Sequence, residues 1–102
     1  MRRVYYIWGV PVGIERGFHA HYNLKQQCFC VCGSVDFILD DGINRRKICL
    51  DNPKKNVFIG NNIWREMKNF SKNSVVLVLA SECYNESDYV RDYNEFLKGI
   101  QQ

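Results

Sequence analysis

Short runs of β-branched and aromatic residues recur along most of the chain and are separated by turn-forming residues. Such runs predict strands, and their close spacing predicts an antiparallel sandwich or barrel. Between two of the runs, the dipeptide Asp41-Gly42 predicts a hairpin with a type I′ turn, in which both residues have positive φ. The runs cover residues 4–8, 18–24, 27–32, 35–39, 47–50, 57–59 and 75–80.

Only the C-terminal end of the sequence has a helical pattern. Ser87 can cap a helix there, and Asp88 complements the positive end of its dipole. We expect this helix to pack one face on the barrel, so the predicted fold class is all-β with a short C-terminal helix. Apolar side chains recur along it with helical spacing, at Tyr89, Tyr93, Phe96 and Ile100.

Length and composition fit one domain. A chain of 102 residues, of which 46% are hydrophobic and 14% aromatic, can bury one core but not two. The sequence contains no internal repeat, linker or low-complexity segment. Residues 1–102 are therefore predicted to form a single domain.

The charge pattern argues against nucleic-acid and membrane partners. A total of 14 Lys and Arg against 11 Asp and Glu gives a net charge of +3, and the basic residues are dispersed among carboxylates. Basic residues cluster only at 45–47 and 54–55, so the basic patch expected of a nucleic-acid binder is weak. No apolar run approaches the ~20 residues that span a bilayer. The first residues lead directly into a strand-like pattern without a cleavable apolar segment, which predicts a cytoplasmic protein.

Five cysteines raise the question of disulfides or a metal site. Cys28, Cys30 and Cys32 alternate along one predicted strand, where residues i and i+2 lie roughly 6.5 Å apart with parallel Cβ vectors, so they cannot easily bridge one another. Closed zinc sites favour two to four residues between ligands, which makes this spacing a poor metal motif. We interpret the cysteines as reduced packing residues of a reducing compartment.

The two histidines of the sequence, His19 and His21, lie two positions apart. In an extended strand residues i and i+2 point to the same face, so both imidazoles project together, into a barrel interior or onto a shared surface. The unperturbed pKa of imidazole, about 6.5, suits proton transfer near neutral pH. Ordinary strand histidines that bond within the fold are the alternative.

The spacing of five residues in this chain resembles the first signature of the cupin superfamily. These residues are Gly13, His19, His21, Gln26 and Gly33. Metal-binding cupins carry a glutamate ligand where this chain has Gln26, and the second cupin segment, around residues 60–63, has no histidine. Two neutral imidazoles and an amide make a poor divalent site, and Arg65 beside them would repel a cation. We therefore expect no metal and no other cofactor.

Five segments, at residues 16–21, 39–42, 64–67, 78–81 and 88–96, together resemble the sugar 3,4-ketoisomerase family, cupin-fold enzymes acting on dTDP-4-keto-6-deoxyglucose for lipopolysaccharide and S-layer sugars. The resemblance runs from about residue 3 to residue 96. It implies a cupin jelly roll and an isomerase that moves the keto group from C4 to C3 through an enediol. It also implies that His19 and His21 are the proton-transfer pair. A positioned group of this kind typically accelerates a reaction roughly 10²–10⁴-fold.

Three residues are candidate substrate contacts, two arginines and a tryptophan. Arg16 can clamp sugar oxygens or the pyrophosphate bidentately, and a surface salt bridge is its alternative role. Arg65 occupies a family position that is arginine or histidine, and the resemblance implies that it influences reprotonation and gives a gluco-configured product. Trp64 can stack on thymine, although a tryptophan is more often a core residue. The alternative for Arg65 is a stacking pair with Trp64 that has no catalytic role.

Two further candidates come from the predicted strands. Tyr5 and Tyr6 alternate sides, so one faces the interior, and we choose Tyr6 as the phenol that contacts substrate. Gln26 can orient a sugar hydroxyl, or its amide can bond to a neighbouring strand.

The chain departs from the family at its start and after the second histidine. Family members usually carry more chain before the Tyr5-Tyr6 strand, and a barrel without its opening strands exposes a sheet edge that can pair with another chain. The resemblance implies a homodimer, often formed by strand exchange, and we expect one here. The family's usual lysine after the second histidine is replaced by Tyr22 and Asn23.

Two functional classes therefore stay open. One is an isomerase of nucleotide-linked 4-keto-6-deoxy sugars. The other is a non-catalytic cupin, either a truncated relative or a nucleotide-sugar-binding module, in which the pocket persists without turnover.

Overall fold

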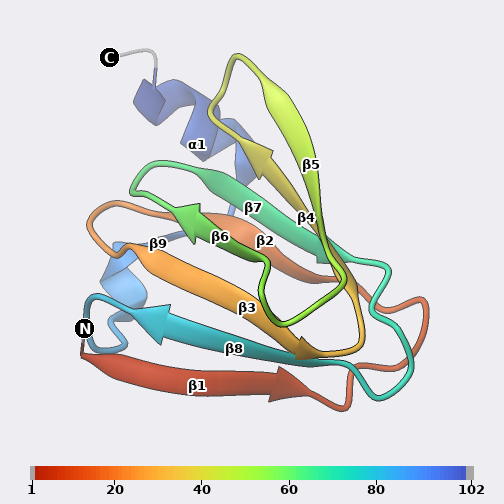
Figure 1. Cartoon of the computed structure of the whole chain (residues 1–102). Helices are drawn as coiled ribbons and strands as arrows, with labels where there is room; N and C mark the ends of the chain where they lie inside the picture. The colour runs from red at the N-terminus through yellow and green to blue at the C-terminus, as the bar shows by residue number, and fades with distance from the viewer. Residues whose placement is uncertain (1, 101–102) are drawn as a thin grey trace.

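The computed structural model describes residues 2–100, which form two facing antiparallel sheets (Figure 1). The strands are β1 (Arg3–Trp8), β2 (Arg16–His21), β3 (Gln26–Cys32), β4 (Val35–Asp40), β5 (Arg45–Leu50), β6 (Asn56–Ile59), β7 (Trp64–Lys68), β8 (Val75–Ala80) and β9 (Tyr89–Val90). One sheet has the strand order β1-β8-β3-β6, and the other has the order β5-β4-β7-β2-β9. This confirms the predicted all-β fold, with a short helix at the C-terminal end.

The core lies between the sheets and is built largely from alternate residues of the strands. On the pair β3 and β8, Cys28 lies opposite Val78 and Cys30 lies opposite Val76, and none of the four is more than 2% exposed. Burying a valine side chain stabilises the fold by roughly 1.5–3 kcal/mol. Cys28 and Cys30 are thus packing residues, as predicted, whereas Cys32 at the strand end is exposed.

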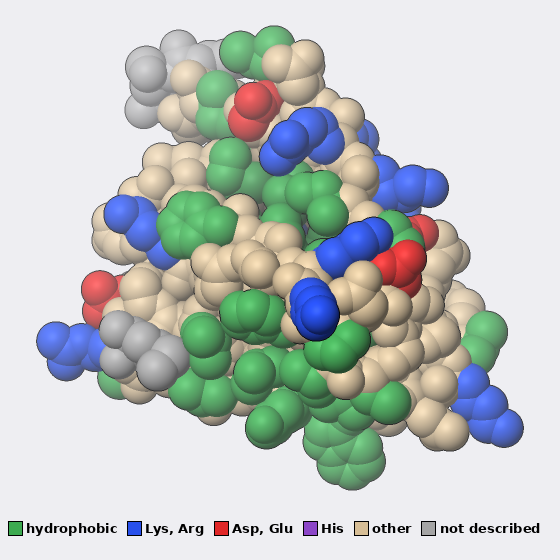
Figure 2. All heavy atoms as spheres, viewed as in Figure 1, with side chains coloured by type: hydrophobic (Ala, Val, Ile, Leu, Met, Phe, Trp, Pro, Cys, Tyr) green, Lys and Arg blue, Asp and Glu red, His purple; other side chains and the backbone are tan. Residues whose placement is uncertain are grey.

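The outer face of the first sheet is also apolar. On β1, the side chains of Val4, Tyr6 and Trp8 are 50%, 57% and 75% exposed, and alternate residues of β8 beside them are only half-buried. Figure 2 shows hydrophobic side chains gathered over β1, β8 and β3. Because β1 pairs only with β8 among the described strands, this face ends at an open sheet edge.

Strand β7 is not predicted from the sequence. Its central residues Arg65 and Glu66 interrupt the apolar alternation on which strand prediction depends. Both are nevertheless buried, because Arg65 bonds within the interior and Glu66 accepts a hydrogen bond from Trp64 and pairs with Arg45. Two of these partners, Gln26 of β3 and Arg45 of β5, are distant in sequence, so local pattern cannot reveal them.

The C-terminal helix α1 covers Tyr93–Ile100 and is shorter than predicted. Asp92 caps it by accepting hydrogen bonds from two backbone N–H groups of its first turn, whereas Ser87 lies in a separate 3₁₀ turn, η1 (Glu86–Asp88). Tyr89 belongs to β9 because the edge of β2 offers its backbone hydrogen-bonding partners there. Within residues 2–100, no helix has the length and apolar character needed to cross a membrane.

The hairpin between β4 and β5 forms as predicted, but its turn is longer. Four residues, 41–44, connect the strands, and only Gly42 among them has a positive φ, 95°. The Asp41 carboxylate accepts the backbone N–H of Ile43 at 2.8 Å and that of Asn44 at 2.7 Å. These side-chain bonds stabilise a wider loop than the predicted type I′ turn.

A β-bulge in β2 places an extra residue, Phe18, between Gly17 and His19. Phe18 has φ 59° and Gly17 has φ 91°, so both adopt the left-handed region. In a regular strand residues three apart point to opposite faces, but the extra residue shifts the alternation by one. Arg16 therefore lies on the same face of β2 as His19.

Replacing Gly17 with alanine should lower the free energy of unfolding by about 1–3 kcal/mol, because a side chain is strained at this φ. The added Cβ would also lie 3.0 Å from the Arg65 backbone oxygen. Urea denaturation measures the loss. The control is Gly99→Ala in α1, where the added Cβ meets no atom within 4 Å, and which should be neutral or stabilising by about 0.5–1 kcal/mol. Equal effects of the two substitutions would contradict the strain argument.

Candidate active site

A cleft of about 450 Å³ opens between the edge strand β1 and the β2 and β9 edge of the facing sheet. Larger hollows of about 650 and 690 Å³ lie at the turn between β4 and β5 and beside the segment 82–88, and neither is lined by a histidine. The cleft is lined by Tyr5, Tyr6, Ile7, Trp8, Val10, Arg16, Gly17, His19, Met67, Tyr89 and Arg91.

The two histidines are in contact, as their spacing predicts. The ring centroids of His19 and His21 are 4.9 Å apart and the rings are almost perpendicular, at 88°. His19 lines the cleft, whereas His21 is completely buried behind it. The ring of Tyr89 lies against both, with centroids 4.2 Å from His21 and 5.0 Å from His19.

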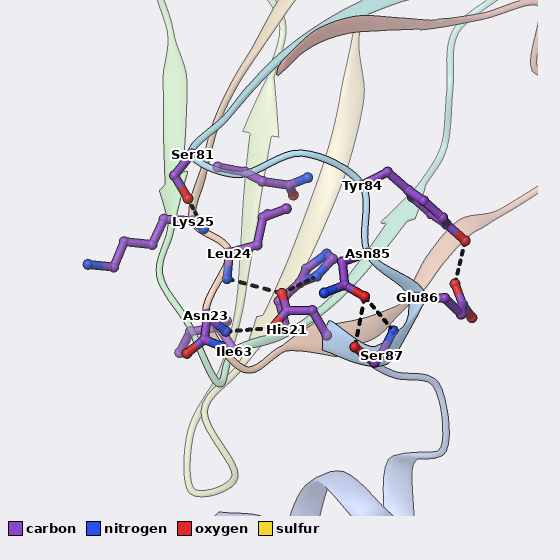
Figure 3. A network of polar contacts seen from close by, with 12 residues as sticks. His21, Asn23, Leu24, Lys25, Ile63, Ser81, Tyr84, Asn85, Glu86 and Ser87 are labelled. Carbon is purple, nitrogen blue, oxygen red and sulfur yellow. Dashed lines mark hydrogen bonds and ion pairs between the residues drawn. The ribbon is translucent and has the colours of Figure 1, made fainter. Parts of the chain in front are cut away.

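Asp88 orients His21 and the turn that follows β2. Figure 3 shows His21, Asn23 and Leu24 within this network of polar contacts. Its carboxylate lies 3.2 Å from Nδ1 of His21 and accepts the backbone N–H groups of Asn23 at 2.8 Å and Leu24 at 3.1 Å. A carboxylate accepts hydrogen bonds, so Nδ1 of His21 carries the proton and Nε2 carries the lone pair. That Nε2 is buried and has no hydrogen-bonding partner among residues 2–100.

A buried guanidinium lies behind the histidines. Arg65 is 1% exposed and donates to the Gln26 side-chain oxygen at 2.6 Å and to the Ile63 carbonyl at 3.0 Å. The Gln26 amide nitrogen in turn donates to the Tyr5 hydroxyl at 3.0 Å. Gln26 is therefore bonded at both ends of its amide, which links strands β1, β3 and β7.

Burial and the nearby positive charge keep both imidazoles neutral. Loss of hydration, followed by the charge of Arg65, lowers the pKa of His19 to about 3. The same two causes lower the pKa of His21 to about 4, although Asp88 opposes them. The ordinary histidine pKa expected from the sequence is therefore wrong for this site, and both rings are available as proton acceptors at neutral pH.

The predicted orientation of the first tyrosine pair is wrong. Arg3, Tyr5 and Ile7 are the partly buried residues of β1, so Tyr5 faces inward and Tyr6 faces outward with 57% of its surface exposed. The two tyrosines alternate as expected, but the sequence does not fix which of them points inward. Tyr6 borders the mouth of the cleft, and Tyr5 bonds to the interior amide.

Trp64, predicted to stack on thymine, does not line the cleft. It is 3% exposed and packs beneath α1, with ring centroids 5.2 Å from Tyr93 and 5.8 Å from Phe96. Its Nε1–H donates to Glu66 at 3.0 Å. Because neighbouring strand residues point to opposite faces, Arg65 points into the interior and the two side chains do not stack.

Sequence reasoning missed three residues of the site, Asp88, Tyr89 and Arg91. The guanidinium carbon of Arg91 lies 4.2 Å from the centroid of the Tyr89 ring, and Arg91 lines the cleft. The helical spacing of the C-terminal segment concealed them, because it assigned Tyr89 to a helix face. The feature of the sequence that could have identified them is the similarity of residues 88–96 to the sugar 3,4-ketoisomerase family.

The lowered pKa values of the histidines predict a pH dependence of stability. The unfolded chain binds protons near pH 6.5, whereas the folded chain holds these rings neutral until their pKa values of about 3 and about 4. The neutral histidines therefore contribute fully to the free energy of unfolding above about pH 6.5, and this contribution is lost as the pH falls from about 6.5 towards 3. A double variant, His19→Asn with His21→Asn, should lose stability less steeply between about pH 6.5 and 5, above the range in which carboxylates titrate. Urea denaturation at stepped pH measures both slopes, and parallel slopes would contradict the assignment.

Comparison with known proteins identifies the family. The family model described as "FdtA: WxcM-like, C-terminal" matches residues 1–101. A TDP-4-oxo-6-deoxy-alpha-D-glucose-3,4-oxoisomerase of Aneurinibacillus thermoaerophilus is 45% identical over 100 residues, which are 98% of this chain and 72% of that protein.

Two solved structures are similar over nearly the whole chain. A 3,4-ketoisomerase from Helicobacter canadensis is 46% identical, with a TM-score of 0.95 over 98% of this chain and 75% of that one. A histidine-to-asparagine mutant of the 3,4-ketoisomerase QdtA from Thermoanaerobacterium thermosaccharolyticum, in complex with TDP-4-keto-6-deoxyglucose, is 40% identical with a TM-score of 0.94, over 97% and 72% of the two chains. This chain therefore belongs to the FdtA family of WxcM-like C-terminal domains.

Proposed function

We propose that this protein is a sugar 3,4-ketoisomerase that moves the keto group of dTDP-4-keto-6-deoxyglucose from C4 to C3, in the biosynthesis of deoxysugars for cell-surface polysaccharide. The observation that carries the proposal is the pair of neutral, contacting imidazoles, one of which lines the cleft. The names of the similar proteins support the reaction and the nucleotide-sugar substrate.

The reaction is an internal redistribution of hydrogen and needs no external oxidant. The hydrogen on C3 is acidic because C4 carries the ketone, so a base removes it and an enediol forms between C3 and C4. A proton then adds to C4 while the hydroxyl at C3 becomes the new ketone. Each step needs one group that accepts a proton and one that returns it.

His19 and His21 can together supply that acceptor and donor. His19 lines the cleft, so we assign it the proton exchange with the sugar carbons. His21 lies in contact with it, and Asp88 favours the protonated form of His21 through their hydrogen bond. Both rings are neutral in the free protein, and Asp88 is the group that opposes the lowered pKa of His21, so we propose that His21 carries a proton only transiently during turnover.

Positive charge around the cleft suits the enediolate and disfavours a metal ion. Arg65 lies close enough to lower the pKa of both histidines, and Arg16 lines the cleft. Fixed cations stabilise a developing oxyanion in a dry site, and the same charges would repel a divalent cation. The Gln26 amide, in the position of a cupin ligand, is already bonded to Tyr5 and Arg65. We therefore propose a metal-independent isomerase in which Arg16 binds substrate oxygens.

Hydrogen exchange at C3 tests this function. Incubation of dTDP-4-keto-6-deoxyglucose with the protein in deuterated water should exchange the C3 hydrogen and give the 3-keto product, followed by NMR. His19→Asn and His21→Asn should each slow exchange by roughly 10²–10⁴-fold, the usual contribution of a proton-transfer group.

Binding of dTDP by calorimetry provides the control, because both variants should retain it. Unchanged exchange in either variant would refute the assignment of that histidine. Tight dTDP binding by the unaltered protein without any exchange would support the non-catalytic sugar-binding module instead.

We propose that the protein forms a homodimer through the apolar outer face and open edge that include β1, with exchange of strands. Contiguous exposed apolar surface of this kind marks an interaction site, and an unpaired strand edge can add a strand from a second chain. The exposed side chains of Val4, Tyr6 and Trp8 on β1 supply the apolar surface. A second copy offers the same surface and the same edge, so each complements the other.

Light scattering coupled to size exclusion should give twice the 12.0 kDa mass of one chain. Replacing both Val4 and Trp8 with lysine should yield the monomer, because two buried charges would have no partner in the interface. Ile43→Lys is the control, since Ile43 is 85% exposed but lies at the turn between β4 and β5, and it should remain dimeric. A monomeric unaltered protein would contradict the proposal.

The cytoplasm is the compartment that we propose. All five cysteines are free thiols, and two of them, Cys28 and Cys30, are buried core residues. Free cysteines in this number suit a reducing environment. A cytosolic nucleotide sugar would be available to the cleft there.

A further inference from the structure

The cleft contains a second exposed arginine whose charge the proton-transfer steps do not use. The side chain of Arg91 is 52% exposed and lines the cleft together with Arg16. It follows directly after β9, in which Val90 pairs with Ala20 of β2. In an antiparallel pair the next position lies opposite His19, so Arg91 extends along the same edge of the cleft as that histidine.

Arg91 is occupied by a carboxylate in this structure. Its Nε and Nη2 atoms donate to the two oxygens of Glu86 at 2.8 and 2.9 Å, a bidentate arrangement. The Tyr84 hydroxyl donates to the same carboxylate at 2.5 Å and so fixes its position. The bond to Arg91 is the main cause that lowers the pKa of Glu86 to about 2, so the carboxylate is ionised at neutral pH.

The geometry of this ion pair is that of phosphate recognition. A guanidinium fork binds two oxygens of a phosphate in the same way as it binds the two oxygens of a carboxylate. The Glu86 side chain is 57% exposed and the ion pair is open to solvent, so another anion can reach the guanidinium and take its place. Tyr89 lies between Arg91 and the histidines, in contact with both, which places the guanidinium at the rim rather than at the reacting carbons.

We propose that Arg91 binds the diphosphate of the nucleotide sugar, and that Glu86 occupies Arg91 in the free protein until the diphosphate displaces it. The inference rests on the proposed function, because it needs a nucleotide diphosphate in the cleft. Glu86 is then an internal competitor of the substrate. It sets the affinity of the cleft for phosphate without touching the ligand.

Two substitutions that break the same ion pair should change dTDP affinity in opposite directions. Arg91→Met should weaken dTDP binding about tenfold or more, because a charge-assisted bidentate contact is lost. Glu86→Gln should tighten it about two- to fivefold, because the competing charge is removed while the shape is kept. A structural disturbance caused by loss of the pair would weaken binding in both variants. Calorimetry with dTDP at fixed ionic strength measures both affinities.

An exposed ion pair elsewhere provides the matched control. Lys55 and Asp51 pair at 2.9 Å with half of each side chain exposed, so Lys55→Met removes one cation from the surface but should leave dTDP affinity unchanged. Equal dTDP affinity of Arg91→Met and the unaltered protein, or weaker binding by Glu86→Gln, would overturn the inference while the proposed function stands. Failure of the unaltered protein to bind dTDP would overturn both.

Discussion

The buried guanidinium of Arg65 connects the two sheets and sets the electrostatics of the cleft. Burying an unpaired charge is strongly unfavourable, so this side chain has to find hydrogen-bonding partners inside the fold. It finds Gln26 on β3, which passes the link to Tyr5 on β1. One charged residue of the second sheet thereby fixes two polar residues of the first. After loss of hydration, which is the larger cause, the same charge lowers the pKa of both histidines.

The presence of most of the strands and the contact between the histidines follow from local pattern. Alternation along a strand and turn residues between strands are properties of neighbours in sequence, so they predict the all-β fold and the shared face of His19 and His21. Alternation does not reveal which of the two faces of a strand is buried, because that depends on which face meets the other sheet. For that reason the alternation of Tyr5 and Tyr6 is predictable, but the choice of the inward residue is not.

The remaining site residues depend on contacts that are distant in sequence. Asp88 reaches His21 across 67 positions. Strand β7 pairs with β2 and β4, and its buried Arg65 and Glu66 have partners on β3 and β5. The helical spacing of Tyr89, Tyr93 and Phe96 is real, yet the free edge of β2 captures the first of them as a strand residue. Trp64 is similar, since its place beneath α1 is decided by the packing of that helix.

The bulge at Phe18 makes the residue count of β2 part of the chemistry. In a regular strand, side chains an even number of positions apart point to the same face, and those an odd number apart point to opposite faces. With one supernumerary residue, an odd separation between Arg16 and His19 behaves as an even one. Insertion or deletion of a single amino acid here would move the arginine to the opposite surface of the sheet and leave the imidazoles in place. The number of residues between Arg16 and His19 is therefore constrained, because a change by one would separate their faces. Substitutions at single positions would not reveal this restriction.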